Sequence, residues 1–152
     1  MATTATTTHV PAFVRLGNLF TRTMLRAGIR LNGFGRPMYL LTVRGRKSGQ
    51  PRTTPVVVIE QDGQRYLVAP YGIVDWVRNL RAAGRATLSW GRRHETVIAT
   101  ELSPEQAAPV IRSILPRAPK VIQDYFDVTP ESSLEEFIRD APNHPMFAVH
   151  PA

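Results

Sequence analysis

Apolar residues near the start of the chain recur at the three- and four-residue spacing of an amphipathic helix, which we expect over residues 10–27. One face carries four large apolar residues: Phe13, Leu16, Phe20 and Met24. Another face carries three arginines: Arg15, Arg22 and Arg26. Such a helix most often packs on a sheet, and a basic amphipathic helix also suits an anionic membrane surface. Residues 28–37 have the composition of a connecting loop.

Beyond residue 37 the chain changes to short segments rich in valine, isoleucine, threonine and aromatic residues, separated by turn residues. These segments predict strands at residues 38–43, 53–60, 65–70, 85–90 and 95–102, with a last short strand at 146–149. Asp62-Gly63 predicts a hairpin between the second and third strands. Because little room remains between the strands for crossover helices, the pattern favours a mainly antiparallel barrel over a parallel sheet.

Helical segments interrupt and follow these strands. Residues 73–83 have helical spacing, and Gly84 can end that helix. Ser103 is followed by a proline and, three positions after the serine, by a glutamine, which predicts a capped helix to about residue 115. Another helix is expected to begin between residues 129 and 132.

The composition is that of one folded domain. The 152 residues are 43% apolar, and we assign residues 10–152 to this domain, after a threonine-rich tail at residues 1–9 that we expect to be disordered. The chain has no cysteine and its four histidines are scattered, so we expect no metal site. No apolar stretch reaches the roughly 20 residues of a membrane span, and the first residues do not resemble a signal peptide. We therefore expect a cytoplasmic protein.

The net charge of +7 is unevenly distributed along the chain. Residues 1–93 hold 15 of the 19 basic and three of the 12 acidic side chains, a balance of +12, whereas residues 94–152 have a balance of −5. Nucleic acid is one partner that such a positive field suits. We expect no nucleic-acid partner, however, because the most basic loop has no aromatic residue for base stacking and no DNA- or RNA-binding motif is present.

That basic loop lies between the first two predicted strands. Two glycines and a proline close a short turn in this loop. The loop holds four cationic side chains: Arg44, Arg46, Lys47 and Arg52. Because the cations repel one another, the arrangement indicates a site for a multiply charged anion, which guanidinium groups bind through paired hydrogen bonds. A solvated basic hairpin loop is the alternative. A Walker loop is excluded, since its glycine spacing and its following helix are missing.

No set of catalytic side chains is evident in the sequence. Ser48 lacks the glycine pattern of a hydrolase nucleophile, and no acid–base pair stands out. A barrel with an anion site suits a cofactor that carries its own chemistry, for which the protein supplies binding, orientation and electrostatics.

Three motifs in order resemble the deazaflavin-dependent nitroreductase family: GRKSGQPR at residues 45–52 followed by Pro55, VAPYG at residues 68–72, and WVRNL at residues 76–80. Three ordered motifs are far more specific than one. The resemblance implies an α+β fold, a split β-barrel related to those of the flavin reductases and pyridoxamine phosphate oxidases. It also implies a reduced 8-hydroxy-5-deazaflavin, coenzyme F420, as hydride donor, and a homodimer.

The resemblance further implies which residues contact the coenzyme. Four loop residues would hold its phosphate and oligoglutamate tail: Arg46, Lys47, Ser48 and Arg52. Pro55 would shape the strand beneath the loop. Four residues would lie along the ring: Val68, Ala69, Pro70 and Tyr71. Trp76 and Asn79 would pack and hydrogen-bond from the short helix, although a lone tryptophan is more often part of the core.

Tyr71 and Tyr125 are the candidate catalytic residues, as proton or hydrogen-bond donors to the acceptor. Each is equally consistent with a buried tyrosine whose hydroxyl satisfies a backbone group. Nitroimidazole-reducing members resemble one another in a Trp-Tyr pair on the short helix and several later tyrosines, whereas Val77 follows Trp76 here and only Tyr125 matches a substrate-side tyrosine. We therefore expect a quinone, an activated alkene or a nitro compound as acceptor. A quinone or an activated alkene is favoured over efficient nitroimidazole reduction, because an apolar pocket favours flat apolar acceptors.

Two other readings of the barrel remain open. One is a related barrel that binds flavin mononucleotide (FMN) or haem. The other is a carrier that stores a coenzyme or lipid without catalysis.

Overall fold

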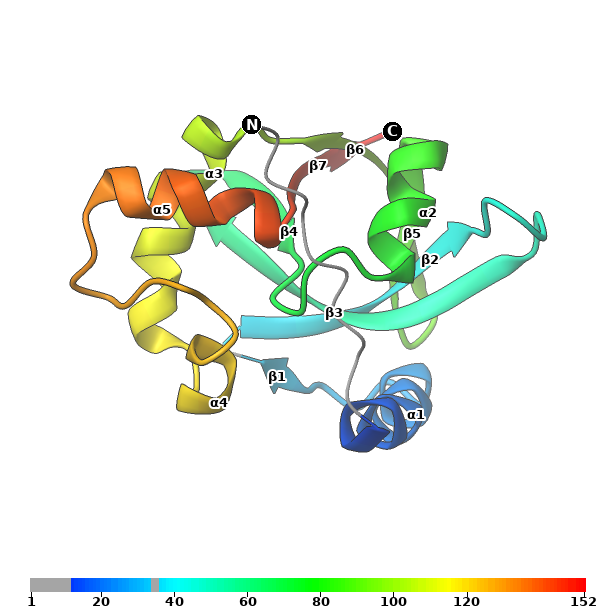
Figure 1. The fold of residues 1–152 in the computed structure, drawn as a ribbon. Helices are drawn as coiled ribbons and strands as arrows, with labels where there is room; N and C mark the ends of the chain where they lie inside the picture. Colours follow the sequence, from blue (N-terminus) through cyan, green and yellow to red (C-terminus); the bar gives the residue numbers. More distant parts are fainter. Residues whose placement is uncertain (1–11, 34–35) are drawn as a thin grey trace.

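The fold is a closed antiparallel barrel with helices on its outside (Figure 1). The computed structural model describes residues 12–33 and 36–152, so the expected tail at residues 1–9 lies outside the described residues. The sheet order is β1-β2-β3-β4-β7-β6-β5, and pairing of β2 with β5 closes the barrel. Its strands are β1 (Asn32–Gly33), β2 (Arg36–Arg44), β3 (Pro51–Gln61), β4 (Gln64–Val68), β5 (Arg85–Trp90), β6 (Arg93–Glu101) and β7 (Met146–Pro151). The predicted mainly antiparallel barrel is confirmed.

The core of the barrel is built from alternate strand residues and from helix α2 (Asp75–Ala83). Leu41, Leu67 and Phe147 are buried on the strands, where they meet Val77 and Leu80 of α2. The helix ends where the sequence predicts, at a glycine with a φ of 69°, a left-handed conformation that costs a glycine little. This packing fixes α2 against β2 and β5.

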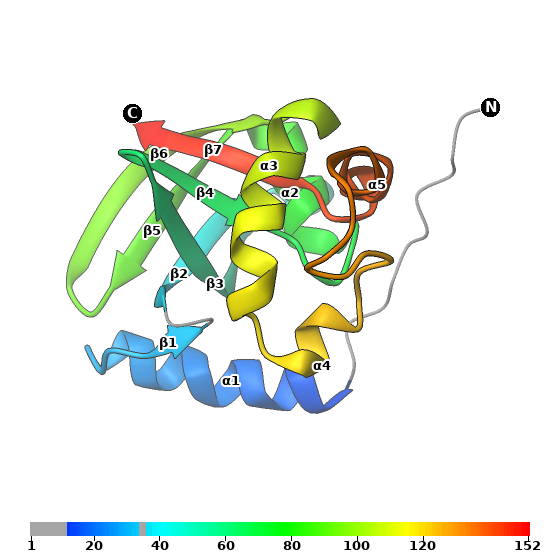
Figure 2. The same ribbon diagram turned by 90° about the vertical axis from the view of Figure 1, so that its left-hand side faces the viewer.

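The later helices cover one side of the barrel (Figure 2). Their buried residues form a second apolar cluster with residues of β3, β4 and β7. These helices are α3 (Pro104–Ile114), η1 (Leu115–Arg117), α4 (Lys120–Gln123), α5 (Leu134–Asp140) and η2 (Ala141–Asn143). The predicted capping box at Ser103 is confirmed. The predicted start of α5 is wrong by one residue: the Ser132 hydroxyl accepts from the backbone of Thr129, so Ser133 caps the helix instead.

Helix α1 (Ala12–Arg26) contacts the barrel mainly through its C-terminal end. Leu25 is fully buried, and its carbonyl accepts a hydrogen bond from the backbone of Gly91 in the β5–β6 turn. Leu16 and Phe20, by contrast, are 73% and 67% exposed. The expectation that this face packs on the sheet is therefore wrong for those two residues, while the side chain of Phe13 lies outside the described ones. Among the described residues, no helix is long and apolar enough to cross a membrane.

Candidate functional site

The basic loop is a tight turn between β2 and β3, held by its own backbone and by one side chain. The Gly45 amide donates to the Gln50 carbonyl at 2.8 Å, and the Gln50 amide donates to Ser48 Oγ at 3.2 Å. A Cβ added to Gly45 would lie 2.9 Å from Ser48 Oγ and 3.1 Å from the Gln50 oxygen. The turn therefore requires glycine at this position, and Ser48 shapes the loop from within.

Arg46 is tied back to helix α2. Its backbone amide and its Nη1 both donate to Asn79 Oδ1, at 3.1 Å and 2.8 Å, and its Nη2 lies 3.4 Å from Asp75 Oδ1. Asn79 is buried, so its carbonyl oxygen acts as a fixed acceptor inside the protein. The sequence predicts a coenzyme contact for Asn79 and gives no sign that it anchors the loop. Asp75 is a further site residue that the sequence reasoning missed.

Lys47 and Arg52 carry the exposed charge of the loop. Both residues are exposed, and neither forms a hydrogen bond or ion pair with the part of the chain that the structure describes. A groove of about 1000 Å³ next to the loop is lined by Arg44 and Arg85 among others. Within residues 12–33 and 36–152, Asp75 is the carboxylate that pairs with the loop, so most of the positive charge of the loop is available to an anion.

A groove joins the basic loop to the turn after β4. Its volume is about 870 Å³, which is in the range of small-molecule sites. Ten of the eleven residues predicted to contact the coenzyme line it: Arg46, Lys47, Ser48, Arg52, Pro55, Val68, Pro70, Tyr71, Trp76 and Asn79. Ala69 is 1% exposed and does not line the groove, and the Ala69 amide instead donates to the Pro145 carbonyl. Asn18 of α1 and Met38 of β2 also line the groove and were not predicted.

The two candidate catalytic tyrosines lie side by side. The ring centres of Tyr71 and Tyr125 are 4.8 Å apart, with one ring edge-on to the other. Tyr71 lines the groove, whereas Tyr125, in the α4–α5 connection, contacts the ring of Tyr71 and is not one of the lining residues. Burial, together with the neighbouring Tyr125, raises the pKa of the Tyr71 hydroxyl above its ordinary value of 10. Tyr71 is therefore a neutral hydrogen-bond donor over the whole physiological range.

A buried histidine holds the turn that carries Tyr71. His144 Nδ1 lies 2.9 Å from the Pro70 carbonyl, to which it must donate because a carbonyl only accepts. Its Nε2 lies 3.3 Å from Asp140 Oδ2, and its ring stacks on Phe126 at 3.8 Å. Burial opposes charge on Asp140, but the neighbouring His144 and hydrogen bonds from Asn143 Nδ2 and the Asp127 amide outweigh it and lower its pKa. Scattered histidines gave no sequence signal for this role.

The family model described as F420H(2)-dependent quinone reductase matches residues 15–130. The chain belongs to this family. Coenzyme F420 is accordingly its cofactor. The protein is an F420-dependent reductase, an oxidoreductase that acts on a small-molecule acceptor. No curated protein gives a significant match.

Solved structures of other proteins have a similar fold. An F420-H2 dependent reductase (FDR-A) aligns with a TM-score of 0.52 at 23% identity, over 76% of this chain and 95% of that one. A chain described as a domain-swapped dimer aligns with a TM-score of 0.53 at 23% identity, over 91% and 97%. A pyridoxinephosphate oxidase family protein from Clostridium acetobutylicum aligns with a TM-score of 0.50 at 11% identity, over 75% and 74%. The predicted split-barrel fold is confirmed.

The groove of this family member fits an elongated anionic coenzyme with a flat ring. Its cationic end offers Lys47 and Arg52 to phosphate and carboxylate groups. Its other end has aromatic and apolar walls: Val68, Pro70, Tyr71 and Trp76. The cationic end matches the anionic phosphate and tail of coenzyme F420, and the apolar end matches its flat ring, so the residues of the groove suit this coenzyme.

Proposed function

We propose that this protein transfers a hydride from reduced coenzyme F420 to a quinone. The observation that supports this most strongly is one continuous groove that joins the cationic loop, with Lys47 and Arg52 exposed in it, to the turn bearing Tyr71. When bound, the coenzyme supplies the hydride, and the side chains supply position and charge.

The residues of the groove divide this work between them. Lys47 and Arg52 bind the phosphate and the oligoglutamate tail, and Arg46 fixes the loop that presents them. Pro70, Tyr71 and Trp76 flank the ring. The turn is anchored at Ala69 and Pro70 by residues 144–145, so it forms a rigid wall rather than a loop that must be ordered on binding.

We propose that the tyrosine pair lies on the acceptor side of the ring, because Tyr71 lines the groove and contacts Tyr125. Reduction of a quinone places negative charge on an oxygen, which a neutral hydroxyl stabilises by hydrogen bonding. Because the pKa of Tyr71 is raised, its hydroxyl remains a donor up to and beyond its ordinary pKa of 10. The groove walls next to Tyr71 are apolar, at Val68, Pro70 and Trp76, which favours a flat quinone over a nitroimidazole.

We expect Tyr125→Phe to lower kcat for a quinone by roughly tenfold while leaving coenzyme affinity unchanged, because the change removes one donor and keeps the ring contact. Tyr71→Phe is expected to act in the same way. The assay is anaerobic oxidation of the reduced coenzyme by a panel of quinones, enones and nitro compounds.

The matched control for this pair is Tyr66→Phe, a tyrosine on β4 that does not line the groove. Full activity of both site variants would mean that the proton comes from water and that the tyrosines only pack. A nitro compound turned over better than every quinone would contradict the proposed acceptor.

We also propose that the exposed apolar face of α1 rests on an anionic membrane surface, where quinones with apolar tails are found. Three of its residues project together from the helix: Leu16, Leu19 and Phe20. Arg26, exposed at the end of the helix, follows them and suits anionic headgroups. The barrel is proposed to form a homodimer, in keeping with the solved relative described as a domain-swapped dimer.

Phe20→Ser together with Leu16→Ser is expected to abolish sedimentation with vesicles that contain anionic lipid, since about 2–3 kcal/mol of transfer free energy accompanies each large side chain. Val121→Ser, at an exposed apolar residue on α4, is the control. Light scattering on the same samples measures the oligomeric state. If the parent protein did not bind vesicles and the α1 double variant lost the dimer, the apolar face of α1 would be a contact between two copies of the chain instead.

A further inference from the structure

Two consecutive residues before β7 hold the turn that carries Tyr71. The Ala69 amide donates to the Pro145 carbonyl at 2.9 Å, and His144 Nδ1 donates to the Pro70 carbonyl at 2.9 Å. Both contacts reach the two residues that directly precede Tyr71 in the chain. Because consecutive Cα atoms are only about 3.8 Å apart, a shift of this segment moves Tyr71 with it. The position of the Tyr71 ring therefore depends on His144.

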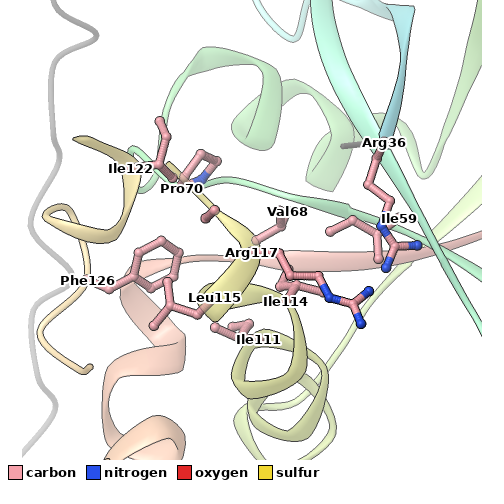
Figure 3. A pocket seen from close by; sticks show the side chains of 11 residues that line it. Arg36, Ile59, Val68, Pro70, Ile111, Ile114, Leu115, Arg117, Ile122 and Phe126 are labelled. Carbon is pink, nitrogen blue, oxygen red and sulfur yellow. The ribbon is translucent and has the colours of Figure 1, made fainter. Parts of the chain in front are cut away.

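Apolar packing behind the turn limits its movement but gives it no preferred direction. Pro70, Ile122 and Phe126 line the same small pocket between the barrel and the later helices (Figure 3). The space inside this pocket is about 20 Å³, about one water molecule, so its side chains are nearly close-packed. Apolar contacts are non-directional, whereas a hydrogen bond favours one alignment of donor and acceptor. The hydrogen bond from His144 therefore sets the orientation of the Pro70 peptide.

The segment that carries Tyr125 is attached to the same histidine. Phe126, the next residue along the chain, stacks on the His144 ring with 3.8 Å between the ring centres. The Asp127 amide donates to Asp140 Oδ2 at 3.2 Å, and His144 Nε2 lies 3.3 Å from that same oxygen. His144 is 3% exposed and Asp140 is 6% exposed. Two buried polar side chains thus contact both of the segments that carry the candidate catalytic tyrosines.

Oxygen atoms on two sides give the His144 ring one favourable orientation. The Pro70 carbonyl faces Nδ1, and the Asp140 carboxylate faces Nε2. Turning the ring over would place carbon atoms opposite both oxygens. Asp140 is held in turn by Asn143, whose Nδ2 donates to Asp140 Oδ1 at 3.2 Å. The histidine and the aspartate therefore form one connected unit between the two segments.

We propose that His144 and Asp140 are positioning residues that hold the rings of Tyr71 and Tyr125 together. The two rings meet edge-on with their centres 4.8 Å apart, which requires both segments to be placed at once. Neither His144 nor Asp140 lines the coenzyme groove, so each acts through the segments that it contacts. The effect on catalysis rests on the proposed role of the tyrosines in quinone reduction, whereas the effect on the ring contact does not.

Nuclear magnetic resonance of the coenzyme-free protein, labelled with ring-13C tyrosine, tests the positioning directly, because the chain has only four tyrosines. The parent protein should show a nuclear Overhauser effect between the Tyr71 and Tyr125 rings. His144→Phe keeps a ring for stacking but removes the donor, and it should weaken this effect at least threefold while leaving the signal of Tyr39 unchanged. His144→Asn places an amide donor near the position of Nδ1 and should retain the effect. An unchanged effect in His144→Phe, or an equal loss in both variants, would overturn the proposal.

Two further variants separate positioning from loss of stability. Asp140→Asn keeps an oxygen for the Asp127 amide and removes the charge that faces His144, so it should shift the signals of both tyrosines even if His144→Phe does not fold. Phe137→Leu truncates a buried ring on the same helix and is the control. It should lower the melting temperature and leave the ring contact unchanged. No shift in Asp140→Asn, or loss of the ring contact in Phe137→Leu, would refute the assignment.

Kinetics show whether His144 acts through Tyr71. His144→Phe should lower kcat for a quinone about fivefold or more and change coenzyme affinity by less than about twofold, because His144 lies outside the groove. Combined with Tyr71→Phe, it should add no further loss, since a positioning residue has no effect once its target hydroxyl is removed. Losses that multiply would contradict the proposal. Full activity of Tyr71→Phe alone would refute the donor role of that tyrosine, and the resonance experiment would still decide the positioning.

Discussion

Replacing Lys47 and Arg52 together by alanine is expected to weaken coenzyme F420 binding by about a hundredfold or more at low salt. Each residue makes a charge-assisted contact worth roughly 1.5–3 kcal/mol, and about 1.4 kcal/mol corresponds to a factor of ten. Both side chains are exposed and have no partner in the described chain, so their loss leaves no buried group unsatisfied. Affinity is measured by coenzyme fluorescence, and circular dichroism checks the fold.

The control must remove the same charge at another place. Arg92→Ala does so in the exposed β5–β6 turn, outside the groove. We expect it to change affinity by less than about twofold, because exposed charges farther apart than a Debye length are screened. The effect of the double variant should shrink as salt rises. If Arg92→Ala and the double variant weakened binding equally, the loop would act only through net charge and not as a binding site.

Asn79→Leu is expected to lower coenzyme affinity about tenfold or more, although Asn79 is buried beneath the loop. The substitution removes the acceptor that holds both the backbone amide and the guanidinium of Arg46. Such unsatisfied groups cost about 1–3 kcal/mol each. The loop would then lose its fixed position over α2, and Lys47 and Arg52 would have to be ordered by the ligand itself.

Val77→Ala is the matched control for Asn79→Leu. Val77 is fully buried on the same helix and faces the barrel core, without contact to Arg46. Its truncation should lower the melting temperature and leave affinity nearly unchanged. Parallel losses of stability and affinity in both variants would show that affinity follows the stability of α2, and the anchoring role of Asn79 would then be wrong.

Local patterns predicted the parts of this fold that are governed by neighbouring residues. The strands from β2 to β7 follow from alternating β-branched residues, and Gly84 and Ser103 end and begin helices as their chemistry requires. The basic turn is similarly local, since Gly45 is needed at a backbone position with no room for a Cβ. For these strands, helix ends and the basic turn, the sequence alone is enough to predict the local structure.

Other features depend on residues far apart in the chain, which spacing does not reveal. His144 binds the carbonyl of Pro70, 74 positions earlier, and Arg46 is held by Asn79, 33 positions later. Periodicity also showed that Leu16 and Phe20 share a face of the helix. It did not show that this face is exposed, because helical spacing does not reveal what packs against a face. The coenzyme contacts inferred for individual residues remain predictions.

Anaerobic mixing of the protein with reduced coenzyme F420 and a quinone tests the central claim most directly. We expect the quinone to oxidise the coenzyme in a protein-dependent reaction, and we expect NADPH, mixed in its place, to react far more slowly, because the chain has no dinucleotide-binding glycine turn. Comparable turnover with NADPH alone, or tight coenzyme binding without oxidation by any acceptor of the panel, would contradict the account.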